Sequence, residues 1–187
     1  MNQIIEGLVE SRGIESAFID AWGNPTTISD DTKIKLLKAM GYQVDDVERL
    51  EQQLEDNYAK QWLGNLNPVQ VIKHDESFVF PLRVSIEMAA QSFALQLVFE
   101  DGVTHHHIIE PVDYTLINVV EIEDEELHEY AISLDLDLPL GYHKLTLLRD
   151  GIALSTSSII KVPKRCFIPE DIAKGKKIWG LSVNYIV

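Results

Sequence analysis

The sequence predicts an α+β protein in which a helical subdomain precedes an immunoglobulin-like antiparallel β-sandwich, with one further buried strand at the C-terminal end. Apolar residues recur at helical spacing over residues 1–67, and short alternating apolar runs separated by turn residues fill residues 68–162. Residues 178–187 are almost continuously apolar, whereas residues 163–174 contain two prolines and resemble a linker. The predicted domains are therefore 1–67, 68–162 and 163–187.

The first part of the helical subdomain is a helix that Gly13 ends. Four apolar residues repeat there at intervals near 3.6 residues: Ile4, Ile5, Leu8 and Val9. A second short helix is expected over residues 15–21, and residues 22–25 (Trp-Gly-Asn-Pro) are typical of a turn.

Two more helices follow in the prediction. Ser29 or Asp30 caps the first of them and Gly41 ends it. Asp45 followed by Glu48 resembles a capping box, which opens the second. Their buried stripes are expected to hold Ile34, Leu37 and Met40 in the first helix, and Val47, Leu50, Leu54 and Tyr58 in the second.

The sandwich is predicted from alternation and from two hairpin signals. Residues 93–99 and 130–138 alternate between apolar and smaller or polar side chains, as strands buried on one face do. Asp-Gly pairs at 101–102 and 150–151 separate strand-like runs, which is a strong signal for tight hairpins. No helix is expected between the strands, so antiparallel pairing is favoured.

The apolar run at residues 178–187 is typical of a strand buried on both faces, as in a parallel sheet. No helix or further strand follows it in the sequence to cover those faces. We therefore expect the chain to be cut from a longer protein at this strand.

Composition excludes several classes of protein. The net charge is −14, and binding of nucleic acid phosphates would require concentrated Lys and Arg. Segments 1–67 (6 basic, 12 acidic) and 68–162 (5 basic, 16 acidic) are acidic, whereas 163–187 (5 basic, 2 acidic) is basic. The apolar runs are too short for a membrane span, and the N-terminus lacks the basic region of a signal peptide. Cys166 is the single cysteine, so a cytoplasmic protein without disulfides is expected.

Five segments distributed along the whole chain carry a family resemblance. They are Phe-Ile-Asp-Ala-Trp-Gly at 18–23, Leu-Leu-Lys-Ala-Met-Gly at 36–41, Leu-Pro-Leu-Gly-Tyr-His-Lys-Leu-Thr-Leu at 138–147, Pro-Lys-Arg-Cys at 163–166, and Trp-Gly at 179–180. In this order and spacing they resemble the bacterial amylomaltase (4-α-glucanotransferase, MalQ-type) family, in the branch that carries an extra N-terminal region.

The resemblance implies a parent enzyme of carbohydrate metabolism that transfers α-1,4-glucan segments between maltodextrins with retention and without a cofactor. An aspartate nucleophile and a glutamate acid/base would lie on later strands of a (β/α)₈ barrel. Residues 178–187 would then be the first strand of that truncated barrel, and the partner of this chain would be the missing barrel. No residue here matches the catalytic residues, so we assign no catalytic, cofactor-binding or metal site and expect the isolated chain to be inactive.

Other conspicuous residues have ordinary structural interpretations. His105, His106 and His107 alternate between faces of a strand, so a solvated strand is favoured over a metal site. The acidic run 121–129 lacks the spacing of a calcium loop and is favoured as a solvated loop or edge.

Three single residues complete the candidates. Cys166 has no persuasive histidine base and is interpreted as a linker residue. Trp22 is the tryptophan best placed for stacking on a sugar, although packing anchors are more common. Tyr142 resembles a tyrosine corner whose hydroxyl bonds to the backbone. An independent glucan-binding module and a protein-interaction module remain open as alternatives.

Overall fold

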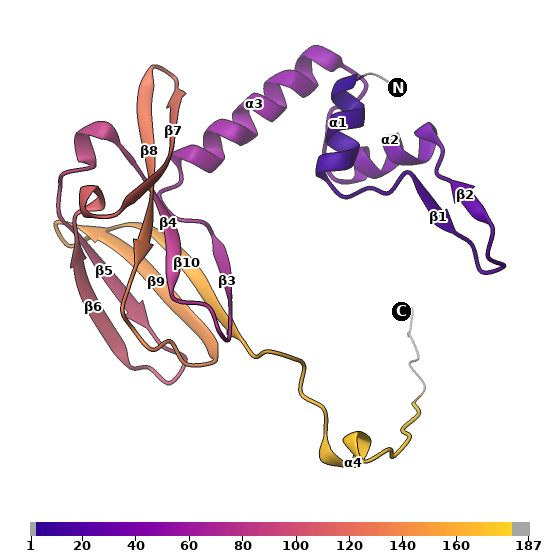
Figure 1. Cartoon of the computed structure of the whole chain (residues 1–187). Coiled ribbons are helices and arrows are strands. Elements are labelled where there is room, and N and C mark those ends of the chain that lie inside the picture. The colour runs from indigo at the N-terminus through magenta and orange to yellow at the C-terminus, as the bar shows by residue number, and fades with distance from the viewer. Residues whose placement is uncertain (1–2, 181–187) are drawn as a thin grey trace, which may run out of the picture. The chain divides into compact units, whose positions relative to one another are not determined.

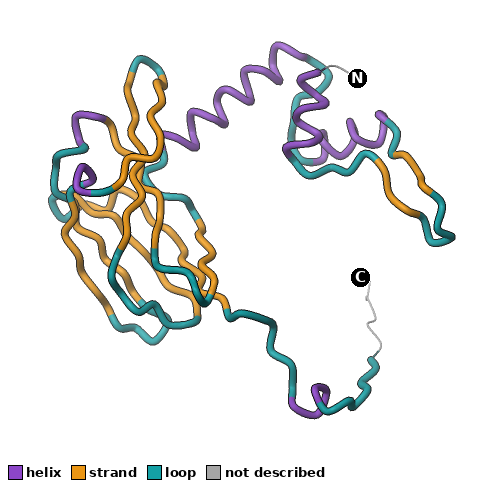
Figure 2. The backbone as a smooth tube through the Cα atoms, viewed as in Figure 1, coloured by secondary structure: helices purple, strands orange, loops and turns teal. Residues whose placement is uncertain are grey.

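The structure is a computed structural model that describes residues 3–180. The chain divides into two compact units, Met1–Leu63 and Gly64–Val187 (Figure 1). Figure 2 shows that helices dominate the first unit and strands the second.

The first unit combines helices with a small β-hairpin. Its helices are α1 (Gln3–Ser11), α2 (Asp30–Ala39) and α3 (Val47–Leu63), and its strands are β1 (Ala17–Ile19) and β2 (Pro25–Thr27). The apolar residues that these helices and the α2–α3 connection bury form one cluster: Ile5, Leu8, Val9, Leu37, Val44 and Leu50. The stripe predicted for α1 is therefore part of a core.

Capping residues explain where two of these helices begin. The Ser29 hydroxyl accepts a hydrogen bond from the Thr32 backbone N–H at 3.2 Å, so Ser29 is the cap of α2, as predicted. At α3 the Asp46 carboxylate accepts from the Arg49 backbone N–H at 3.2 Å. The predicted capping box at Asp45 is therefore wrong by one residue.

Four further predictions for this unit are wrong. Residues 15–21 contain strand β1 rather than a helix, because Ala17 to Ile19 pair with Pro25 to Thr27 around a tight loop. Met40 follows the last turn of α2 and is 51% exposed. Val47 and Tyr58 are 36% and 50% exposed, because the stripe of α3 that joins the core is centred on Leu50.

The second unit contains two β-sheets. Among the described residues, the first has five strands in the order β3-β10-β9-β5-β6 and the second has three in the order β4-β8-β7. The strands are β3 (Val69–Lys73), β4 (Val79–Ser85), β5 (Phe93–Val98), β6 (Thr104–Ile109), β7 (Thr115–Ile122), β8 (Glu125–Ser133), β9 (Gly141–Arg149) and β10 (Ile152–Val162). Short 3₁₀ turns lie at Ile86–Met88 and Pro111–Asp113.

The two sheets pack face to face as a sandwich (Figure 1). Inward-facing residues alternate along the strands, and the largest buried ones include Phe80, Leu82, Phe93, Leu95, Leu145, Leu147 and Ile159. One pair departs from the predicted antiparallel arrangement, because β3 pairs with β10 in parallel. This parallel pair places the first and last strands of the sandwich beside each other.

Tight turns connect three hairpins. The predicted turn at Asp150 and Gly151 is confirmed, and both residues have positive φ, 51° and 78°. The predicted turn containing Asp101 and Gly102 likewise joins β5 to β6. The acidic run 121–129 covers the turn of a third hairpin, with Glu123 and Asp124 at φ 51° and 65° between β7 and β8. Because β7 is an edge strand of its sheet, the run lies at a sheet edge, one of the two predicted alternatives, rather than in a long loop.

The segment after the sandwich is only partly described. The predicted linker contains a one-turn helix, α4 (Glu170–Ala173), directly after Pro169. In the predicted final strand, residues 178–180 have no regular structure and residues 181–187 lie outside the described range. A search of the described residues found no helix that is long and apolar enough to span a membrane.

Candidate functional site

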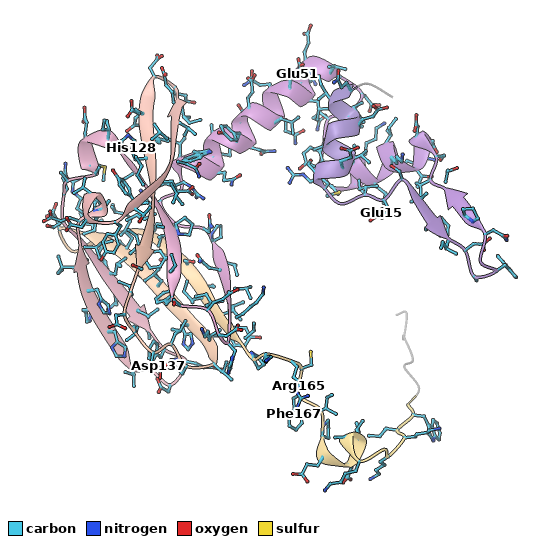
Figure 3. All side chains as sticks on the ribbon, in the orientation of Figure 1. Glu15, Glu51, His128, Asp137, Arg165 and Phe167 are labelled. Atoms are coloured by element: carbon cyan, nitrogen blue, oxygen red, sulfur yellow. The ribbon has the colours of Figure 1, made fainter. Side chains whose placement is uncertain are left out.

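The most distinctive hollow of the sandwich lies at one end, between the β3–β4 turn and the β8–β9 connection. It has a volume of about 470 Å³ and is lined by residues 74–78, residues 136–140 and Lys161. Figure 3 labels Asp137 at this end of the sandwich, opposite His128 near the tip of the β7–β8 hairpin. The hollow therefore belongs to the second unit alone.

Lys161 is the unusual residue of this hollow. It follows Ser157 and Ile159 on the inward-facing side of β10, so its side chain leaves the core at the end of the sandwich. The residue is only 8% exposed, and its Nζ donates a hydrogen bond to the Glu76 carbonyl oxygen at 2.6 Å. Among the described residues this is its one polar partner, although an ammonium group has three donors.

The turn that supplies this carbonyl is held by its own hydrogen bonds. Glu76 donates its backbone N–H to the Lys73 carbonyl at 3.0 Å, and its carboxylate accepts from the Lys73 N–H at 3.0 Å. On the other wall, the Leu136 N–H donates to the Leu134 carbonyl at 3.0 Å, and the Leu134 N–H donates to the Phe78 carbonyl of the first wall at 3.1 Å. Both walls are therefore preformed by backbone contacts.

A second hollow of about 320 Å³ shares Pro139 and Leu140 with the first. Phe99, Glu100 and His143 line its other side. Because Pro139 and Leu140 line both hollows, the two lie next to each other along the same end of the sandwich.

His143 and Gly141 fix the shape of the second hollow. His143 Nδ1 accepts the Glu100 backbone N–H at 3.3 Å, and its Nε2 lies 2.9 Å from the Pro139 carbonyl oxygen, which assigns the proton to Nε2. The Tyr142 N–H donates to the Glu100 carboxylate at 3.0 Å. Gly141 has φ +137°, and a Cβ at this position would collide with the Glu100 carboxylate.

The polar groups of the first hollow have mixed character. Asp75, Glu76 and Asp137 give three carboxylates against the one ammonium group of Lys161, and Glu76 is also paired with Lys73 at 3.6 Å. Hydrogen-bond donors and acceptors are both present, next to apolar Pro139. Over residues 3–180 no group of three or more His, Cys, Asp or Glu side chains is arranged to hold a metal ion.

The three consecutive histidines alternate as predicted, but they are not uniformly solvated. His106 is exposed, whereas His105 and His107 are half-buried on the opposite face of β6. The His105 ring lies 4.7 Å from the Phe99 ring, centroid to centroid. His107 Nε2 is buried and has no hydrogen-bond partner among the described residues.

Three side chains on β8 of the acidic hairpin are linked by hydrogen bonds. The Tyr130 hydroxyl lies 3.1 Å from His128 Nδ1, and His128 Nε2 lies 2.6 Å from a Glu126 carboxylate oxygen. Burial raises the pKa of the Tyr130 hydroxyl above its ordinary value of 10.0. Tyr130 therefore remains neutral over the physiological range and can donate to His128.

A buried ion pair on the outer face of the three-stranded sheet was not predicted. Arg83 Nε donates to Glu129 Oε1 at 2.8 Å, and the two residues are 6% and 7% exposed. Arg83 Nη2 also donates to Asn67 at 2.9 Å, and Asn118 donates to the other Glu129 oxygen at 2.7 Å. The sequence shows an arginine and a glutamate in two strand-like segments. Which charged residues of the two strands lie opposite each other can be predicted only when the strand register is known.

Trp22 lies at the tip of the β1–β2 hairpin and is 85% exposed. The Asp20 carboxylate shapes this loop by accepting the backbone N–H groups of Trp22 at 2.9 Å and Asn24 at 2.8 Å. Its hydrogen bond from the Asn24 backbone, followed by those from Trp22 and Gly23, holds the pKa of Asp20 below its ordinary value. Within the described residues Trp22 is therefore not a packing anchor.

The exposure of Tyr142 and Cys166 tests the roles predicted for these two residues. Tyr142 is 68% exposed and its hydroxyl has no hydrogen-bond partner among the described residues, so the tyrosine-corner interpretation is wrong. It lies on the outward-facing side of β9, because neighbouring His143 is buried. Cys166 is an exposed free thiol in the segment after the sandwich, as a linker residue would be.

The sequence contains only a weak signal for the hollow at the end of the sandwich. Lys161 stands in an apolar run, Ser-Ile-Ile-Lys-Val at 158–162, where a charged residue on the inward-facing side is unusual. Its partner Glu76 is 85 residues away and is brought close by the parallel β3–β10 pair. Without that pairing the lysine could not be distinguished from a solvated one.

Comparison with known proteins gives consistent findings. Residues 65–163 match the family described as the MalQ N-terminal beta sandwich domain. The chain is 28% identical, over 191 aligned positions, to the 4-alpha-glucanotransferases of Mycobacterium bovis and Mycobacterium tuberculosis. That alignment covers 98% of this chain and 25% of each relative, so the chain spans about a quarter of their length. The crystal structure of amylomaltase from Corynebacterium glutamicum has a similar fold, with a TM-score of 0.66 and 24% identity over 87% of this chain and 23% of that one.

Proposed function

Because the chain belongs to the family of MalQ N-terminal β-sandwich domains, we propose that it is the N-terminal, non-catalytic region of a 4-α-glucanotransferase. The observation that carries this proposal is the family match over the sandwich, joined to an alignment with two such enzymes over 98% of the chain. The relatives are about four times longer, which leaves room in them for a separate catalytic domain.

In the proposed parent enzyme, an aspartate attacks the anomeric carbon of an α-1,4-linked glucan and forms a covalent glycosyl-enzyme. A glutamate protonates the departing sugar oxygen and later takes the proton from the acceptor hydroxyl that attacks the glycosyl-enzyme; two inversions restore the original configuration. One glycosidic bond is broken and one is formed, and no cofactor is required. We assign neither carboxylate to residues 1–187.

The proposed organisation is a helical subdomain at 1–67, an immunoglobulin-like sandwich at 68–162, and a linker that leads into the first strand of a (β/α)₈ barrel. The strand order supports the immunoglobulin-like description: β4, β8 and β7 are neighbours in one sheet as strands B, E and D are, and β5, β9 and β10 are neighbours in the other as strands C, F and G are. The proposed partners are that barrel, in the same cytoplasmic protein, and maltodextrin substrate.

Activity measurements on two polypeptides test this proposal. The full-length protein that contains this region is expected to convert maltotriose into glucose and longer maltodextrins, whereas residues 1–187 alone are expected to leave maltotriose unchanged. Product chromatography measures both. Disproportionation by the isolated chain would show that the region is itself catalytic, and an inactive full-length protein would exclude the glucanotransferase assignment.

A further inference from the structure

We propose that the hollow between the β3–β4 turn and the β8–β9 connection is a non-catalytic binding site for α-1,4-glucan. This proposal rests on the proposed function for the identity of the sugar. The hollow itself, its buried lysine and its mixed polar lining are properties of the sandwich.

Lys161 has donors to spare at the edge of the hollow. The residue is 8% exposed as a whole, and its ammonium group donates to one protein oxygen among the described residues, the Glu76 carbonyl. A buried charged donor is costly unless its remaining hydrogens find acceptors, and these hydrogens belong to a residue that lines the hollow. The site therefore favours a ligand that carries hydrogen-bond acceptors.

The charge around the hollow is negative on balance. Asp75, Glu76 and Asp137 outnumber Lys161 even though Glu76 is paired with Lys73, so the lining as a whole repels an anion such as phosphate. A metal cation would face the Lys161 ammonium, and the described residues contain no suitable ligand cluster. A neutral ligand remains, and it must both accept from Lys161 and donate to carboxylates. Sugar hydroxyl groups do both.

The shape of this end of the sandwich suits an extended ligand. The second hollow lies beside the first on the other side of Pro139 and Leu140, and Leu140 is 53% exposed. Phe99 and the apolar ring of Pro139 offer surfaces for the C–H faces of sugar rings, while His143 and Glu100 are held in place by hydrogen bonds. Two adjacent hollows fit a linear oligosaccharide better than a single sugar unit.

Preformed walls lower the cost of binding. The Lys73–Glu76 hydrogen bonds and the Leu134–Phe78 bond fix the two walls before a ligand arrives. Less conformational entropy is then lost on association. All of the residues that line the two hollows belong to one compact unit of the chain.

Amide NMR spectra of the 187-residue chain, titrated with maltoheptaose, test the site directly. We expect shifts confined to residues 73–78, 99–101, 136–143 and 161, and weaker binding of maltose than of maltoheptaose. Lys161→Met, which keeps the length of the side chain, and Asp137→Asn are each expected to weaken binding about tenfold, the effect of losing one charged hydrogen bond. Asp137 is exposed, so its variant preserves the fold even if Lys161→Met does not.

Asp135→Asn is the matched control, because Asp135 is an exposed carboxylate two positions away that does not line the hollow. It is expected to bind maltoheptaose as the parent chain does. The absence of shifts at these residues, equal binding by Asp137→Asn and the parent chain, or the same shifts with inorganic phosphate would overturn the proposal. Maltotriose disproportionation by the full-length protein is measured separately, so a failed titration with intact activity refutes this site alone.

Discussion

At the scale of single residues, Arg83 and Glu129 depend on each other because both are almost fully buried. Arg83→Met leaves the Glu129 carboxylate without its partner in a low-dielectric setting, and its Asn118 contact cannot neutralise that charge. We expect the free energy of unfolding to fall by about 3–5 kcal/mol, the usual cost of breaking a buried ion pair. Urea denaturation measures it.

Replacing both members is the informative control for this pair. The double variant Arg83→Met with Glu129→Leu removes the charges together, so much of the lost stability should return. Lys35→Met breaks the exposed Lys35–Asp31 pair and should change stability by less than about 1 kcal/mol. If Arg83→Met has the same free energy of unfolding as the unmodified chain, the pair is not effectively buried.

Gly141 combines a backbone angle that other residues avoid with a close neighbour. At φ +137° an alanine is strained, and its Cβ would displace the Glu100 carboxylate that accepts the Tyr142 N–H. Gly141→Ala is expected to destabilise the sandwich by about 1–3 kcal/mol. Gly7→Ala in helix α1, where a Cβ has open space, is the control and should be neutral or mildly stabilising. Thermal unfolding of both variants checks this; equal midpoints would contradict the strain argument.

Asp20 makes the Trp22 loop sensitive to acid. Hydrogen bonds from Asn24, Trp22 and Gly23 hold the pKa of Asp20 below its ordinary value of 3.8. A carboxylate with a depressed folded pKa stabilises the fold fully above its unfolded pKa, and this contribution is lost as pH falls through the folded pKa. The Trp22 and Asn24 amide resonances are expected to keep their positions from neutral pH to near 3.8 and to shift only below it. Asp20→Asn should remove that transition, and a midpoint above 3.8 would be contrary evidence.

At the scale of elements, helix α2 depends on Ser29 for its start. The Ser29 hydroxyl accepts the Thr32 N–H, one of the backbone donors that a helix cannot satisfy internally. Ser29→Ala is expected to cost about 1 kcal/mol of local stability, and Ser29→Asp should retain it. Amide hydrogen exchange in α2 measures the change, with the sandwich amides as an internal reference. Unchanged exchange in Ser29→Ala would mean that packing of Leu37 alone holds the helix.

Elements were predictable where a residue has one preferred local conformation. Asp150 and Gly151 revealed their turn because Gly favours positive φ, whereas Glu123 and Asp124 adopt the same kind of turn without a glycine. The apolar residues at 17–19 are compatible with a helix as well as with a strand. The loop held by Asp20 favours the strand, because it brings residues 17–19 beside residues 25–27. Whether such a short segment forms a helix or a strand therefore depends on contacts with residues outside the segment, which its own apolar spacing does not show.

Across the molecule, the sequence predicts the sandwich but not the hollow that is its candidate site. Alternation along the strands was sufficient to predict a core, because burial on one face leaves a period of two. The hollow forms where Lys161 lies beside Glu76. The parallel pair of β3 and β10 brings these two residues together, and the sequence does not predict that pair. Arg83 and Glu129 were hidden for the same reason, since strand register determines which charges meet.

The sandwich is expected to fold without the rest of the chain if its first residues are included. Its core cluster runs from Leu66 to Ile159, and Arg83 is bonded to Gly64 and Asn67 on the segment before β3. A fragment of residues 64–163 should therefore unfold in one cooperative transition, as small single domains do. A fragment that starts at residue 68, the boundary predicted from the sequence, lacks Leu66 and the contacts of Arg83 with Gly64 and Asn67, and should be less stable in urea. Equal stability of the two fragments would show that this segment does not belong to the folding unit.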